Sequence, residues 1–297
     1  MIASQLRFLY YMNRGEFSKA APHREQVDLH AAHTGSLWQV ETWESPSLIP
    51  VYATLSEIVA MTRVAHRLEF LSQSLPPLRR YARLAGQAML RSRGEPRYAP
   101  LVAEEYLSFA PRSFIGWGVS MTFLARGYNE IGQHAEAKLV CEKARLHVTD
   151  ADREYVAPFM GLEIQLAIAD AGVGQFDAAT RRVDDLIQRF EGCDHPLVLG
   201  LLHETRARIH FAQGKFDEYE RSRIEAERWL LPTQTPSLVA KCRRLSELTQ
   251  DHSGRMNLVP QPSMAPQGAL PACEDDLGVT RTLWLSGTEG APRRSGQ

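Results

Sequence analysis

Apolar residues recur at steps of three and four positions along most of the first 250 residues. This spacing places them on one face of an α-helix. The stretch containing Met121, Leu124, Ala125, Tyr128 and Ile131 shows the pattern plainly. Strand signals, such as strict alternation of apolar and polar residues, are absent throughout. The pattern therefore predicts an all-α fold in which each helix buries one stripe of apolar side chains.

A short motif returns about every forty residues along the same stretch. It consists of a glycine, an aromatic residue two positions on and an alanine five positions on, as in Gly174, Phe176 and Ala179. Six copies, some with substitutions, begin at Gly15, Ser56, Gly94, Gly132, Gly174 and Gly214. Their successive spacings are 41, 38, 38, 42 and 40 residues. A nearly constant period of this length indicates a stack of helical units.

Each glycine falls where one helix has to end and the chain has to turn, which often requires a positive φ. The apolar residue two places on then begins a second helix, and the small alanine lets the two helices approach closely. A lone hairpin cannot bury both of its faces, so neighbouring hairpins are expected to stack. The predicted helix pairs are 2–13 and 16–34, 37–55 and 57–74, 78–93 and 96–109, 112–131 and 133–148, 152–173 and 175–191, and 196–213 and 215–230, followed by a capping helix at 235–249.

Two segments depart from the pattern. Pro46 and Pro50 interrupt the segment 37–55, which predicts either a kinked helix or a loop followed by a helix. From about Asp251 onward, proline and glycine crowd the chain. A composition of that kind does not support a packed core. We therefore expect a helical-repeat domain over 1–250 and a disordered tail over 251–297.

The first predicted helix is unusually apolar for the end of a stack. It contains Ile2, Leu6, Phe8 and Leu9, whereas a terminal repeat normally has a polar outer face. This composition favours the hypothesis that further repeats or a catalytic domain precede this segment. Self-association through the same helix is a second way to cover it.

Residues at the fourth and fifth corners match a known repeat consensus. The matching positions are Leu124, Ala125, Tyr128, Gly132, Ala137 and Ala144, and then Phe176 and Ala179 after Gly174. Over roughly 2–250 the chain resembles the tetratricopeptide-repeat family. The resemblance implies a right-handed α-solenoid of about six hairpins with a capping helix. Its period is near forty rather than thirty-four, and Asp170 and His210 replace Tyr128, so a HEAT-like array with a period of ~40–47 residues stays open.

A narrower resemblance covers residues 100–245. Segments such as Pro111–Trp117 and Gly200–Glu204 are similar to the repeat region that follows the catalytic part of large bacterial serine/threonine kinases and signalling ATPases. That resemblance implies a regulatory or sensor segment whose enzyme lies elsewhere.

Motifs for catalysis are missing from the sequence. It contains no phosphate-binding loop, no kinase signature and no nucleophile elbow. His203 and Glu204 begin like a zinc-protease motif, but Ala207 stands where the second histidine belongs. The four cysteines form no CxxC pair. We therefore expect no catalytic residues, no cofactor and no metal, so that the chain is not an enzyme.

Net charge and hydropathy limit the classes of partner that we expect for this chain. The net charge of -1 provides no basic footprint for nucleic acid or anionic lipid. No signal peptide is visible, and no apolar run reaches the ~18 residues that a membrane span requires. A cytoplasmic protein that binds a peptide or another protein, and neither nucleic acid nor membrane, is the resulting expectation.

The tetratricopeptide resemblance also implies a binding surface, because the first helix of each hairpin lines a concave groove in that family. Counting back from each glycine selects the groove positions. The predicted partner-binding residues are Tyr81, Arg91, Arg126, Asn129, Arg208 and Phe211. Arginine suits carboxylate and peptide-carbonyl acceptors through its planar fork, and the aromatic residues would serve as anchors. The functional hypothesis is a non-catalytic protein–protein interaction scaffold. The alternative is the regulatory segment named above.

Overall fold

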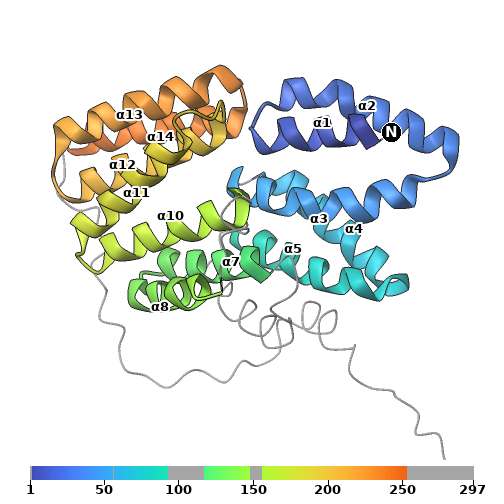
Figure 1. Cartoon of the computed structure of the whole chain (residues 1–297), viewed down its shortest axis with the longest axis horizontal. Helices are drawn as coiled ribbons and strands as arrows, with labels where there is room; N and C mark the ends of the chain where they lie inside the picture. Colours follow the sequence, from blue (N-terminus) through green and yellow to red (C-terminus); the bar gives the residue numbers. More distant parts are fainter. Residues whose placement is uncertain (1, 56, 93–116, 148–155, 253–297) are drawn as a thin grey trace, which may run out of the picture. The chain divides into compact units, whose positions relative to one another are not determined.

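The computed structural model describes residues 2–55, 57–92, 117–147 and 156–252 (Figure 1). Within these ranges the secondary structure is helical and includes no strand. The α-helices are α1 (Ile2–Asn13), α2 (Phe17–Thr34), α3 (Leu37–Leu55), α4 (Ile58–Ser74), α5 (Arg79–Ser92), α7 (Trp117–Glu130), α8 (His134–Arg145), α10 (Val156–Gly172), α11 (Phe176–Phe190), α12 (Pro196–Ala212), α13 (Phe216–Leu230) and α14 (Pro236–His252). The all-α prediction is confirmed for the described residues.

The observed helices follow the predicted ranges closely. The helix α3 continues through Pro46 and Pro50, so the alternative of a loop before this helix is wrong. A short 3₁₀ turn at Pro76–Leu78 precedes α5. The predicted helix at 96–109 lies outside the described residues, and so does the predicted tail beyond His252.

Four of the six predicted corners have a common backbone geometry, and the other two, Ser56 and Gly94, lie outside the described residues. Gly15, Gly132, Gly174 and Gly214 all have positive φ angles, between 72° and 83°. At Gly132, the glycine N–H donates to the carbonyl of Asn129 at 3.1 Å. The next N–H, of Gln133, reaches back to the carbonyl of Tyr128 at 2.9 Å. The same pair of bonds closes the other three corners. This is the Schellman arrangement, which satisfies the last carbonyls of a helix and turns the chain.

The small residue beyond each corner is buried, as the motif predicts. Ala20, Ala137 and Ala179 are at most 1% exposed. Tyr219 replaces the alanine after the last corner and is also fully buried. Its hydroxyl donates a hydrogen bond to the carbonyl of Leu245 in α14, which ties the last hairpin to the capping helix.

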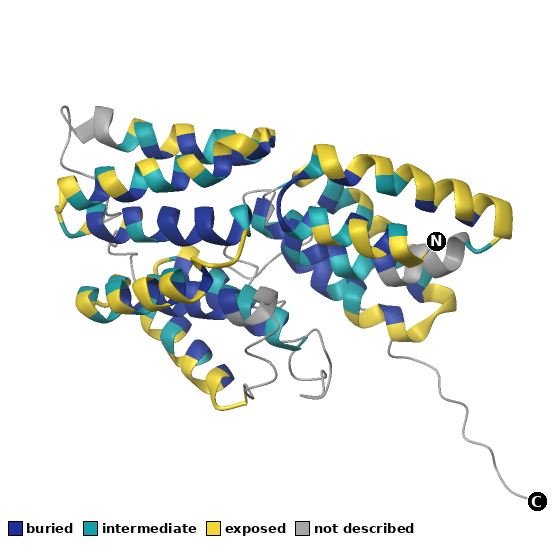
Figure 2. Cartoon of the chain, turned by 45° about the horizontal axis from the view of Figure 1, so that its top comes forward, coloured by how far each residue is buried: buried dark blue, intermediate teal, exposed yellow. Residues whose placement is uncertain are grey.

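Consecutive helices pack against one another. The first helices of successive pairs also touch, as α1 does with α3, α7 with α10 and α10 with α12. Helix α12 is buried along most of its length, whereas α2 presents mainly exposed residues (Figure 2). Burial on both sides explains why the first half of α12, from Leu197 to Leu202, is apolar without interruption, since a helix segment covered on every face needs no polar stripe.

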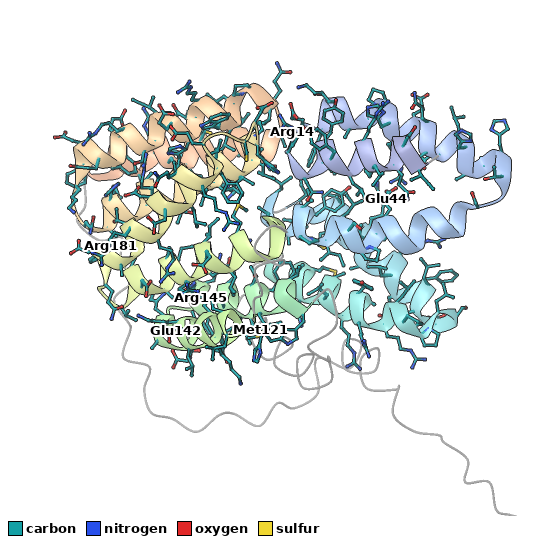
Figure 3. All side chains as sticks on the ribbon, viewed as in Figure 1. Arg14, Glu44, Met121, Glu142, Arg145 and Arg181 are labelled. Atoms are coloured by element: carbon teal, nitrogen blue, oxygen red, sulfur yellow. The ribbon has the colours of Figure 1, made fainter. Side chains whose placement is uncertain are left out.

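The first hairpin also contacts the last helices, which a simple linear stack does not require. Thr235 donates a 2.7 Å hydrogen bond to the carbonyl of Gly15, and Arg14 donates a 2.9 Å bond to Asp194 (Figure 3). Phe8 and Met12 of α1 belong to the same apolar core as residues of α10, α12 and α14. The corner at Gly15 is therefore covered by another part of the chain.

Two buried carboxylates connect the middle hairpins. Glu163 of α10 accepts from Arg182 at 2.9 Å and pairs with Arg145 at 3.0 Å. Asp170 pairs with Arg182 at 3.2 Å and with Lys138 at 2.9 Å. Asp170 is the residue that departs from the repeat consensus. Its charge is compensated by cations from α8 and α11, which accounts for an acid at a buried position.

Gly200 allows the closest approach of α12 to α13, which generates a prediction about stability. A Cβ at position 200 would lie 2.2 Å from Cδ2 and 2.4 Å from Cγ of Leu230. Alanine is a better helix former than glycine by up to ~1 kcal/mol, but overpacking costs about 1–3 kcal/mol. We expect Gly200→Ala to lower the free energy of unfolding by about 1–2 kcal/mol in urea titrations.

The double-mutant cycle with Leu230→Ala tests the cause of that loss. In the Leu230→Ala background the added methyl group has room, so Gly200→Ala should no longer destabilise the protein. Equal losses in both backgrounds would show that crowding against Leu230 is not responsible.

Candidate partner-binding surface

A cluster of charged side chains joins α12 to α14. Glu204 of α12 accepts hydrogen bonds on Oε1 from Nη2 of Arg208 at 3.0 Å. Its other oxygen, Oε2, accepts from Nζ of Lys241 in α14 at 3.2 Å. The Glu204 side chain is 7% exposed, whereas that of Arg208 is 49% exposed. One buried carboxylate therefore serves two cations, and the more exposed cation is the arginine.

Arg126 of α7 adds a third cation to this region. Its Nε donates to Glu130 at 3.1 Å, and Nη1 lies 3.5 Å from the carbonyl oxygen of Ala53 in α3. The positive charges of Arg126 and Arg208 both act on Lys241. We name Arg126, Glu204, Arg208 and Lys241 the inner cluster. Its members come from first helices of the predicted pairs and from the capping helix.

The electrostatics of the inner cluster reflect its burial and its excess of cations. Burial alone would raise the pKa of Glu204, but the charges of Lys241 and Arg208 outweigh it and hold that pKa below its usual value. Burial is the largest cause that lowers the pKa of Lys241, and the two arginines add to it while Glu204 opposes them. A second anion near Lys241 would relieve this repulsion between cations.

The structure brings only part of the predicted binding set to the inner cluster. Arg126 and Arg208 belong to it. The amide of Asn129 is buried and donates to the carbonyl of Gln165 at 2.9 Å. Phe211 packs against Phe216 and Tyr219 within its own hairpin.

The remaining predicted residues lie in α5. Tyr81 is half-buried against the core of α4 and α5. Arg91 lies in the last turn of that helix, and its side chain is outside the described residues.

Lys241 is the member that sequence reasoning missed. The predicted groove positions depend on counting back from a motif glycine. Gly254 follows α14 at 40 residues from Gly214, but Met256 and Val259 replace the aromatic residue and the alanine beyond it, so the motif does not mark this position. The available signal was weak, because one lysine in a polar helix resembles any solvated residue.

The histidines of α12 have structural partners. Arg206 donates a 3.1 Å hydrogen bond to Nδ1 of buried His203 and also contacts Asp184 and Ser222. Nδ1 of His210 lies 3.4 Å from the amide oxygen of Gln213. Among the residues that the structure describes, no group of three metal-ligating side chains is arranged around one point.

The described cysteines show no sign of activation. Burial raises the pKa of Cys141 to about 12 and that of Cys242 to about 11. Thiols with such pKa values are protonated at neutral pH and are poor nucleophiles. Cys193 is exposed in the turn before α12.

Neither protein-family models, curated proteins nor solved structures give a match to this chain. Within the described helices, none combines the length and the apolar character that crossing a membrane requires.

His203 makes folding stability depend on pH. Burial and then the charge of Arg206 lower its pKa to about 4 from 6.5. Between these values the unfolded chain binds a proton that the folded chain does not, so stability falls as pH falls through this window. We expect the His203 contribution to drop by about 2 kcal/mol between pH 7.5 and pH 5.0.

The His203→Asn variant isolates this contribution, since its amide oxygen accepts a hydrogen bond but does not titrate. Urea unfolding of both proteins at the two pH values should show a larger loss for the wild type. Parallel losses would mean that other groups cause the acid destabilisation.

Proposed function

We propose that this chain is a non-catalytic protein–protein interaction module, built as a tetratricopeptide-like solenoid. It binds a peptide or a segment of a partner protein at the inner cluster formed by α7, α12 and α14. The observation that carries the proposal is the convergence of charged side chains from helices far apart in the sequence, with Arg208 still half-exposed.

Three features support the solenoid. The Schellman corners recur at the period of the sequence motif. Small residues beyond them are buried between the helices of each pair. First helices of successive pairs contact each other, as stacked hairpins do when they bury a continuous core.

The chemistry of the inner cluster supports binding. Arg208 and Lys241 share the single carboxylate of Glu204, so these three side chains together have a net charge of about +1. The guanidinium of Arg208 has donors that point in fixed directions, which suits carboxylate or peptide-carbonyl oxygens. The protonated thiols of Cys141 and Cys242 and the engaged Nδ1 of His203 favour a binding role over covalent catalysis.

Selection from a phage-displayed library of random dodecapeptides tests this function. Enriched peptides are synthesised with a fluorescent label, and their dissociation constants are measured by anisotropy. We expect the double variant Arg126→Gln, Arg208→Gln to bind at least ~10-fold more weakly, because each lost charge-assisted hydrogen bond contributes a net ~1.5–3 kcal/mol.

The matched control is Arg221→Gln, Arg228→Gln. Both arginines lie on α13, the second helix of the same hairpin as Arg208, and both are paired with a glutamate within one turn. This control should change affinity less than twofold. If the two double variants behave alike, or if no peptide is enriched, the inner cluster is not the binding surface.

A further inference from the structure

The outer face of the α1–α2 hairpin exposes apolar side chains in a regular line. Ile2, Leu6 and Tyr10 are spaced four residues apart on α1 and are 68%, 54% and 56% exposed. Leu29 on α2 is 55% exposed. It borders a shallow depression that is lined by Ala21, Arg24, Glu25, Asp28, Leu29 and Ala32. We name these residues of α1 and α2, together with Arg7, the N-terminal face.

The N-terminal face carries complementary charges on its two helices. Helix α1 contains no acidic residue, and its Arg7 is exposed. The depression on α2 carries Glu25 and Asp28 against the single cation Arg24. Arg24 pairs with Asp28 at 2.9 Å and also with the buried carboxylate of Glu44 in α3, so its charge is shared between two carboxylates. Within the described part of the chain, Arg7 and Glu25 belong to no ion pair.

Arg7 and Glu25 lie at the same level of the hairpin. Ser4 of α1 donates a 3.0 Å hydrogen bond to Gln26 of α2, and the rings of Tyr11 and His23 stack at 5.6 Å. These two contacts bracket Arg7 on one helix and Glu25 on the other. A two-fold axis that runs between two facing copies, parallel to the helices, would place Arg7 of one copy opposite Glu25 of a second copy, and the reverse pair would form as well.

We propose that two copies of this chain associate through the N-terminal face about such an axis. Each α1 lies over α2 of the other copy. Leu6 and Tyr10 cover Leu29 and the alanines of the depression, and Arg7 pairs with Glu25 across the interface. This arrangement covers an apolar line that is otherwise exposed to water, and it contributes two ion pairs whose partners do not compete within one copy.

The size of the face predicts a weak dimer. Helices of 12 and 18 residues are about 18 and 27 Å long and about 10 Å wide, so they cover roughly 450 Å² per copy. The total of about 900 Å² is below the ~1,200 Å² of stable specific interfaces. We therefore expect a dissociation constant of about 10–100 μM.

Sedimentation velocity of the full chain from 5 to 300 μM, at low salt, tests the proposal. The wild type should shift from monomer to dimer within this range. Leu6→Ser should weaken the dimer at least ~10-fold, because the apolar side chain of Leu6 is removed from water at the interface. Leu139→Ser on α8 is the control, since Leu139 is similarly exposed and lies outside the face.

A charge exchange tests the orientation of the two copies. Arg7→Glu and Glu25→Arg should each weaken the dimer, because they place like charges opposite each other. The double variant Arg7→Glu, Glu25→Arg should restore it. Circular dichroism checks that each variant keeps its helices, and restoration in the double variant would itself exclude a folding defect.

A chain that stays monomeric at 300 μM overturns the proposal. So does a dimer that responds equally to Leu6→Ser and Leu139→Ser, or one that the double exchange does not restore. The proposal does not depend on the inner cluster, and the Arg126→Gln, Arg208→Gln variant should dimerise like the wild type.

Discussion

The Schellman corner is the interaction on which the other features depend. Two backbone hydrogen bonds and a residue with positive φ end one helix and set the direction of the next. Because the corner fixes where the second helix begins, it also fixes which residues of both helices face each other. The burial of Ala137 and Ala179, five residues beyond their corners, follows directly from this geometry. Repetition of the Schellman corner along the chain therefore produces a repeated pattern of helix packing.

The corner at Gly15 has the same backbone geometry as the others but is covered by residues from another part of the chain. A Cβ at this glycine would lie 3.1 Å from Leu238, whereas at Gly132 and Gly174 it would meet nothing within 4 Å. The carbonyl of Gly15 also accepts the hydrogen bond of Thr235. The first hairpin is thereby held against the last helices. Leu6 and Tyr10 of the same hairpin stay exposed to solvent.

The fold contains two networks of charged side chains around buried carboxylates. One is centred on Glu163 and Asp170 of α10, and the other on Glu204 of α12. Glu163 and Asp170 are surrounded by cations from the second helices α8 and α11 and connect the middle hairpins. Arg145 of this network is 45% exposed, about as much as Arg208 at 49%, so exposure alone does not separate the two networks. They differ in the helices that supply the cations, since Arg126 and Arg208 come from first helices, which line the groove in the expected solenoid. This contrast is why the inner cluster, and not the network around α10, is our candidate binding surface.

The sequence by itself determined the all-α class, the helix boundaries within a few residues and the corners at Gly15, Gly132, Gly174 and Gly214. These features depend on helical periodicity and on local backbone preference, which act over a few residues. Only the tertiary structure decided which predicted binding residues meet. It buried the amide of Asn129 against α10, placed Arg126 near Ala53, and added Lys241 from the capping helix α14. Such contacts join positions tens of residues apart. They depend on the relative orientations of several successive hairpins, which a local sequence pattern does not specify.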